Sequence, residues 1–290
     1  MIYLILAIVV SIGIFLVFRF AGIYKLSPLP IVFVNYLIAI LAALSTTRIN
    51  QSVSESLSPG FYIASVIIGV LFMLLFLVVH QSTNSAGISI TSAAAKLSVV
   101  FPVLLSFYID SNDRLYPKKI IGIVILLVAF VLIVYSNGIQ LKKKSLPVFP
   151  LLLFLGMGFV DSLIKLSQQI FIPEEAVSLF TLYVFSVAAI TGFIFLLLKK
   201  KAHLLLNGRT ILLGIVLGLC NYGSLYFIIK ALNLNLHKPT FLDSSRIFML
   251  TNLGVVLLST LVGIILFRER LQRANYIGIL LSIMGFYLIM

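Results

Sequence analysis

Apolar residues along this chain gather in runs of about twenty, and short polar connections separate the runs. A helix of about twenty apolar residues spans the hydrocarbon core of a bilayer, where the backbone must satisfy its own hydrogen bonds. We therefore predict an all-α membrane protein with ten transmembrane helices. The predicted spans cover residues 2–20, 29–47, 60–81, 88–109, 117–136, 147–170, 175–198, 209–232, 240–267 and 274–290.

One span, residues 88–109, departs from the apolar pattern. Its first half is rich in Ser, Thr and Ala, and Lys96 lies about two turns inside it. An ionisable residue within a span costs about 2.5–3.5 kcal/mol on insertion scales, so it indicates a functional site. Pro102 follows six residues later and predicts a kink, because proline removes a backbone donor. The kink fits a hinge beside a cavity and a purely structural bend equally well.

Composition agrees with a membrane protein. The chain is 61% hydrophobic and 10% charged, whereas soluble domains are about 45–50% apolar and about 25% charged. Its net charge of +13 lies mostly in short loops, which favours contact with anionic lipid headgroups over nucleic acid. We expect a multi-pass protein of the plasma (inner) membrane, with the bilayer as its partner. Isolated histidines and a single cysteine predict no metal site and no cofactor.

The two halves of the chain share a motif at one constant offset. Asp113-Arg114-Leu115 precedes Gly122, and Glu269-Arg270-Leu271 precedes Gly278 at the same distance. This predicts a first repeat over residues 1–140 and a second over 141–290, with five spans each. An odd number of spans reverses the second copy in the membrane, so the repeats are inverted, as in many transporters that work by alternating access.

The repeated motif, together with Phe101-Pro102-Val103, resembles the EamA repeat. Ten spans in two five-span halves make the whole chain similar to the drug/metabolite transporter superfamily. Three features depart from the family pattern: Asp113 replaces the usual Glu, Leu258 stands where the first copy has Pro102, and the first span lacks the membrane-embedded Glu of the small multidrug relatives. The resemblance implies cytoplasmic termini, whereas the Lys and Arg bias of the loops places the termini outside. It also implies a central cavity lined by spans 88–109 and 240–267.

Three roles fit Lys96: binding an anionic substrate group, pairing with a buried acid, or extending to the interface. Asp161 is the acid deepest within a span, and its partner is either Lys96 or Lys165, one turn away on the same helix. Gly156 and Gly158 predict close helix packing near Asp161.

The second repeat supplies the counterparts of these residues. Asn252 stands at the same offset from Lys96 as the two motifs do from each other. Arg246 either pairs with Asp243, one turn earlier, or faces the cavity as a carboxylate-binding fork. The remaining deep polar residues either bond one helix to another or contact substrate, and the former is favoured. They are Asn35, Tyr36, Tyr183, Asn221 and Tyr222.

Lys96 and the resemblance together favour a secondary transporter for a small carboxylate-bearing or zwitterionic, amino-acid-like metabolite, and the resemblance implies export as the expected direction. A coupled proton or counter-substrate and a monomeric or homodimeric state are compatible with it. The alternatives are a flippase or exchanger for phosphate-linked lipids or sugars, and a membrane-embedded enzyme. The eight acids are scattered along the chain, so no enzymatic site is expected.

Overall fold

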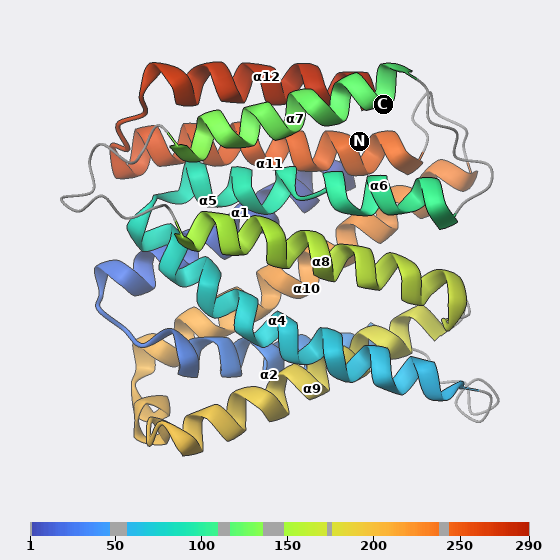
Figure 1. Ribbon diagram of the computed structural model, residues 1–290. Helices are drawn as coiled ribbons and strands as arrows, with labels where there is room; N and C mark the ends of the chain where they lie inside the picture. Colours follow the sequence, from blue (N-terminus) through green and yellow to red (C-terminus); the bar gives the residue numbers. More distant parts are fainter. Residues whose placement is uncertain are drawn as a thin grey trace.

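The computed structural model describes residues 2–46, 57–109, 117–135, 148–172, 176–237 and 244–289, and within them every regular element is helical (Figure 1). The helices of the first half are α1 (Ile2–Ile23), α2 (Pro28–Thr46), α4 (Pro59–Ser85), α5 (Ile88–Leu97), α6 (Val100–Ile109) and α7 (Pro117–Tyr135). Those of the second half are α8 (Val148–Ile170), α9 (Val177–Leu198), the 3₁₀ helix η3 (Ala202–Leu206), α10 (Gly208–His237), α11 (Ser244–Phe267) and α12 (Arg273–Ile289).

The described chain has the features of a multi-pass membrane protein. Nine of its stretches are long and apolar enough to cross a membrane, with α5 and α6 counted together, and α12 is a shorter apolar helix of 17 residues. Large apolar side chains cover the outside of the bundle, where Ile265 is 70% exposed and Leu280 is 65% exposed. Such a surface would promote aggregation in water, whereas lipid chains accommodate it.

Local sequence explains several helix ends. Proline begins α2, α4 and α7, where its missing N–H costs no helical hydrogen bond. Lys25 and Lys200 follow the ends of α1 and α9 with φ of 53° and 52°. Each lies in a Schellman motif, in which the next residue donates to the carbonyl five positions back.

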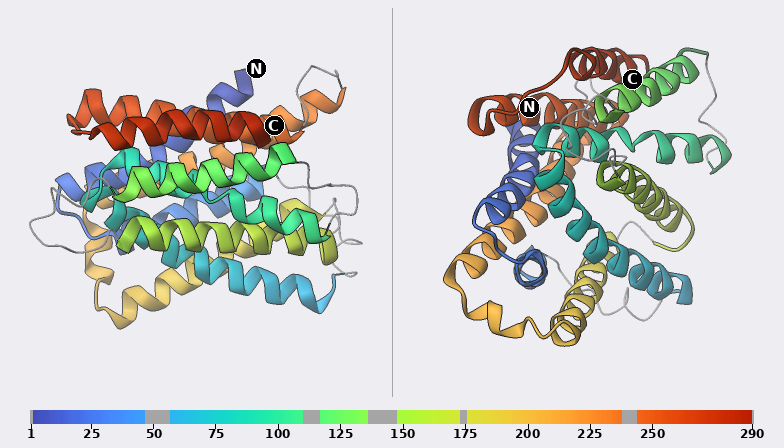
Figure 2. Two further views of the ribbon diagram at one scale, coloured as in Figure 1. Left: turned by 45° about the horizontal axis from the view of Figure 1, so that its top comes forward. Right: turned by 60° about the vertical axis from the view of Figure 1, so that its left-hand side comes forward.

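The helices pack in pairs that recur between the two halves of the chain. In the first set, α1 packs on α10 and α10 packs on α2; in the second, α8 packs on α4 and α4 packs on α9. All four of these pairs join the first half of the chain to the second, as do α2 with α9, α5 with α11, and α7 with α12. α7 and α12 lie side by side at the top of Figure 1 and stay next to each other in both views of Figure 2.

Glycines allow α10 to approach α2 closely. A Cβ added at Gly214 would lie 2.5 Å from Cβ of Val34, and one at Gly218 would lie 2.7 Å from the carbonyl oxygen of Asn35. Side chains at either position would force the helices apart. Gly214 and Gly218 thus form a small-xxx-small pair, which lets two membrane helices pack closely.

Candidate functional site

The helix predicted over residues 88–109 is broken in the middle. α5 ends at Leu97 and α6 begins at Val100. Pro102 explains the position of the break, because a proline ring clashes with the carbonyl four residues earlier, which belongs to Ser98. The Ser98 carbonyl instead accepts a tighter hydrogen bond from the N–H of Phe101, at 3.0 Å. The predicted kink is therefore a local break between α5 and α6, at which Ser98 keeps a helical φ and ψ of −59° and −12°.

Charged side chains from α5 and α8 lie around this break. Lys96 occupies the last turn of α5, where the helix dipole favours a cation. Asp161 on α8 interacts electrostatically with Lys96, and both residues are half-buried. Lys165, one turn further along α8, donates from Nζ to the carbonyl oxygen of Pro102 at 3.3 Å. We call Lys96, Asp161 and Lys165 the charged triad.

Close packing holds α8 against the break. A Cβ at Gly158 would lie 2.1 Å from the ring of Phe101, so only glycine fits there without movement of that ring. A Cβ at Gly156 would lie 2.4 Å from the side chain of Leu75 on α4. Both contacts confirm the close packing predicted beside Asp161.

The N-terminus of α5 is held by Glu269, which follows α11. One carboxylate oxygen of Glu269 accepts from the N–H of Ile88 at 2.6 Å. The other accepts from the N–H of Ser89 at 3.1 Å and from its hydroxyl at 2.6 Å. We call this arrangement the Glu269 cap. It satisfies the free N–H groups of a helix N-terminus with a negative charge, which the helix dipole favours.

Two glycines make room for the Glu269 cap. Gly87 adopts φ of 92°, and a Cβ on it would lie 2.6 Å from a carboxylate oxygen of Glu269. A Cβ on Gly263 of α11 would lie 2.4 Å from the other oxygen. Further along the same interface, the hydroxyls of Ser92 and Ser259 form a buried hydrogen bond between α5 and α11. Polar contacts thus run along the α5–α11 interface.

The other polar residues predicted to lie deep in the spans are spread over several helix interfaces. Asn252 is half-buried on α11, the helix that packs on α5. Asn221 donates to Asn35 across the α10–α2 interface at 3.2 Å, which is the helix-to-helix role favoured for both. Tyr36 is fully buried and stacks on Phe76, with ring centroids 5.7 Å apart. Its hydroxyl has no hydrogen-bond partner within the described part of the chain.

Tyr183 lies in an aromatic cluster between α9 and α4. Its ring centroid is 5.6 Å from those of Phe61 and Tyr62, and 36% of its surface is exposed. Asp243 and the motif residues 113–115 lie outside the described residues, as does the side chain of Arg246.

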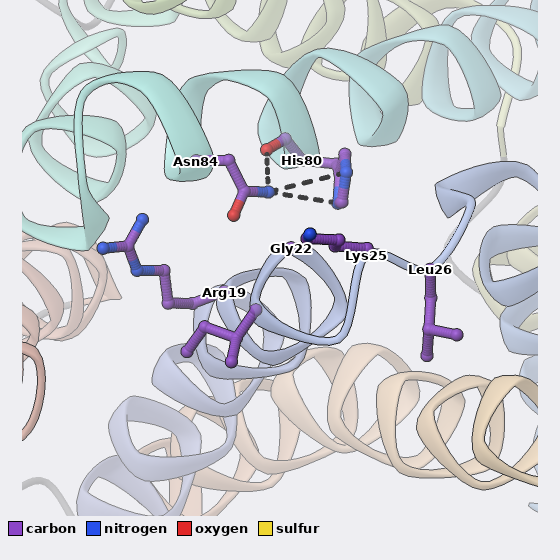
Figure 3. A pocket seen from close by; sticks show the side chains of 7 residues that line it. Arg19, Gly22, Lys25, Leu26, His80 and Asn84 are labelled. Atoms are coloured by element: carbon purple, nitrogen blue, oxygen red, sulfur yellow. Dashed lines mark hydrogen bonds between the residues drawn. The ribbon is translucent and has the colours of Figure 1, made fainter.

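Two neighbouring cavities open at one end of the bundle, where α1, α4 and α11 end. The first, of about 500 Å³, includes Arg19, Lys25, His80 and Asn84 in its lining (Figure 3). The second, of about 370 Å³, includes Arg19 again, with Asn84, Arg268, Glu269 and Arg270. Neither includes a member of the charged triad. Sequence reasoning did not single out Arg19 for this role, although its place one turn from the end of a span was a visible signal.

Comparison with known proteins places the chain in a family without assigning an activity. No family model matches it. A solved crystal structure, covering 97% of each chain at 16% identity with a TM-score of 0.55, shares its fold. A Haemophilus influenzae protein described only as uncharacterized is 30% identical over 222 residues, which is 76% of this chain and 72% of that protein. The chain therefore belongs to the same family as that Haemophilus influenzae protein.

Proposed function

We propose that this protein is a secondary transporter of the EamA type, within the drug/metabolite transporter superfamily. It moves a small carboxylate-bearing or zwitterionic, amino-acid-like metabolite by alternating access, with export as the expected direction. The observation that carries this proposal is the charged triad at the broken helix. Transporters commonly build substrate sites from discontinuous helices whose ends meet inside the membrane.

The charges of the triad match a zwitterion. Two lysines can each attract a carboxylate, and Asp161 can attract an ammonium group. Lys165 already donates to the carbonyl of Pro102, so it is held beside the break from which α6 starts. Charged groups within a span are costly unless they are paired or used, and these three lie together at the break. A zwitterionic substrate could bind there through both of its charged groups.

The recurring helix pairs support two inverted five-helix repeats. The packing of α1 on α10 corresponds to that of α8 on α4, and that of α2 on α10 corresponds to that of α9 on α4. A twofold axis relating α1 to α8, α2 to α9 and α4 to α10 would produce this pattern. In this arrangement the broken α5–α6 and the continuous α11 are counterparts, α12 is the tenth span, and the termini are cytoplasmic.

A transport assay in proteoliposomes tests the role of Lys96. We expect Lys96→Ala to lower transport of amino acids and small carboxylates at least about tenfold, because a charge-assisted contact is lost. Lys118→Ala removes an exposed cation at the start of α7 and serves as the control. Asp161→Asn should reduce amino acid transport more than transport of a simple monocarboxylate. Unchanged transport of every such solute by Lys96→Ala would overturn the proposed site.

A flippase or exchanger for phosphate-linked lipids or sugars is the second candidate. The cavities lined by Arg19, Arg268 and Arg270 favour it, because arginine binds phosphate with a matching planar fork. Including a sugar phosphate and a fluorescent phospholipid among the test solutes separates the two candidates. The first predicts transport that depends on Lys96, and the second predicts transport that depends on Arg19.

A further inference from the structure

The cavity between α1 and α4 contains chemistry that the charged triad does not use. It has a volume of about 500 Å³, and four of its lining residues are polar: Arg19, Lys25, His80 and Asn84 (Figure 3). Arg19 lies one turn before the end of α1, and Lys25 follows the end of that helix. The cavity is therefore situated at the level where a span meets the headgroup region of a bilayer.

The guanidinium of Arg19 is fixed in place but keeps a free donor. Its Nη1 donates to the carbonyl oxygen of Thr83 at 3.3 Å, and its Cζ lies 5.6 Å from the ring centre of Phe267. These contacts tie it to α4 and α11. Its Nε is buried and has no hydrogen-bond partner within the described part of the chain. A buried donor without a partner is costly, so it points to a ligand that accepts a hydrogen bond.

Asn84 fixes the shape of the cavity. Its amide nitrogen donates to the carbonyl oxygens of His80 at 2.8 Å and Phe18 at 3.3 Å, which links α4 to α1. A Cβ on Gly22 would lie 1.6 Å from the side-chain oxygen of Asn84, so α1 needs glycine at this point. The wall beside Arg19 is thus built by specific contacts between two helices.

The positive charge of this region is not balanced by the nearest acid. The residues lining the first cavity include two cations and no acid. The second cavity adds Arg268, Arg270 and Glu269. The residues that line the two cavities therefore include four cations, Arg19, Lys25, Arg268 and Arg270, and one acid.

We propose that the cavity between α1 and α4 binds a phosphate group, with Arg19 and Lys25 as its charged ligands. Phosphate offers several acceptor oxygens and up to two negative charges, which suits a guanidinium fork together with a mobile ammonium. The phosphate belongs either to a membrane lipid or to a soluble phosphate ester, since both present the same group. The site is separate from the charged triad, and its binding does not depend on transport.

The chain offers a closely matched control for Lys25. Lys25 and Lys200 follow the ends of α1 and α9 in the same Schellman geometry, with φ of 53° and 52°. Both are exposed, and both lie at the same end of the bundle, where Lys201 donates to Ser27 at 3.2 Å. Only Lys25 lines the cavity. Asparagine tolerates positive φ, so Lys25→Asn and Lys200→Asn change charge without new backbone strain.

Binding is measured by native mass spectrometry on the full-length protein, purified in detergent and stripped of lipid. The probes are phosphatidic acid against diacylglycerol, and glycerol 3-phosphate against glycerol, so that each pair differs by the phosphate alone. We expect the wild type to retain one phosphate-bearing probe of at least one pair. Arg19→Gln and Lys25→Asn should each weaken that binding at least about tenfold, since a charge-assisted hydrogen bond is lost. Lys200→Asn should bind as the wild type does.

Each outcome decides the question. Retention of phosphatidic acid alone identifies a lipid headgroup, and retention of glycerol 3-phosphate identifies a soluble ester. The proposed site would be overturned if neither phosphate-bearing probe is retained, or if each probe binds no better than its phosphate-free partner. Equal loss of binding in Lys25→Asn and Lys200→Asn would overturn it as well. Circular dichroism verifies that each variant is folded, and the exposed Lys25 keeps the test valid if Arg19→Gln does not fold. A Lys96→Ala variant that loses transport but still binds phosphate shows that the phosphate site does not depend on the proposed transport site. Each proposal can therefore fail without the other.

Discussion

Replacing Glu269 by glutamine tests whether the Glu269 cap holds the half-helix α5 in place. Glutamine preserves the size of the side chain but removes its charge and one acceptor oxygen. In the wild type, the N–H of Ile88 and the N–H and hydroxyl of Ser89 donate to the carboxylate over 2.6–3.1 Å. In the variant, the amide NH₂ group would face the donors of one of these two residues. At least one backbone donor of α5 would lose its partner.

The size of the effect follows from these contacts. A hydrogen bond to a charged group contributes about 1.5–3 kcal/mol, and a negative charge at a helix N-terminus adds about 0.3–1 kcal/mol. Glu269 is half-buried, so water compensates part of the loss. We expect Glu269→Gln to lower the free energy of unfolding by about 2–3 kcal/mol. For a chain of this size this corresponds to a fall in Tm of roughly 4–10 °C.

The assay is thermal unfolding in detergent, followed by circular dichroism, because the chain contains no Trp for a fluorescence signal. Arg270→Gln is the control, since it removes a charge from the adjacent, exposed residue. Its Tm should stay close to that of the wild type. Equal Tm values for Glu269→Gln and the wild type, or equal decreases in both variants, would refute the reasoning.

Three further changes test the packing and the helix break. Gly218→Val should lower the free energy of unfolding by about 1–3 kcal/mol, because a Cβ there would lie 2.6 Å from a side chain of α2, whereas Gly208→Ala, with nothing within 4 Å, should be nearly neutral in the same thermal assay. Ser92→Ala and Ser259→Ala should show a coupling of about 0.6 kcal/mol in a double-mutant cycle, the average for hydrogen bonds between membrane helices; zero coupling would contradict the bond between them. Pro102→Ala restores a backbone N–H, so hydrogen exchange should slow at the break while transport falls severalfold; unchanged exchange would show that the proline does not cause the break.

Much of the fold follows from the length of the apolar runs. Nine of the predicted spans coincide with stretches of the described chain that are long and apolar enough to cross a membrane, as a bilayer requires, and residues 88–109 are divided between α5 and α6. The tenth predicted span coincides with the shorter apolar helix α12. The interruption near Ser98 was also predictable, since Pro102 acts on the carbonyl four residues earlier. The sequence indicated a kink, and the structure has two separate half-helices.

Contacts between distant parts of the chain were not predictable in the same way. The sequence left two partners open for Asp161, and only the packing of α8 on α5 reveals its interaction with Lys96. Glu269 was noticed as part of a repeated motif, but its bonds to Ile88 and Ser89 join residues about 180 positions apart. Tyr183 is a deep polar residue in sequence, yet its hydroxyl-bearing ring lies in a partly exposed aromatic cluster. The length of the apolar runs determines where helices form, whereas tertiary packing determines which side chains come into contact.

Both ends of α5 are held by charge, and this bears on how the protein could move. Glu269 holds its first residues to the end of α11, and Lys96 at its other end interacts with Asp161 on α8. α5 is a helix of 10 residues with one such attachment at each end. In the proposed transporter, a substrate carboxylate that competes for Lys96 would weaken the attachment to α8 while leaving the Glu269 cap intact. The break before α6 would then allow α5 to pivot about the cap, so substrate binding and helix movement would be coupled through Lys96.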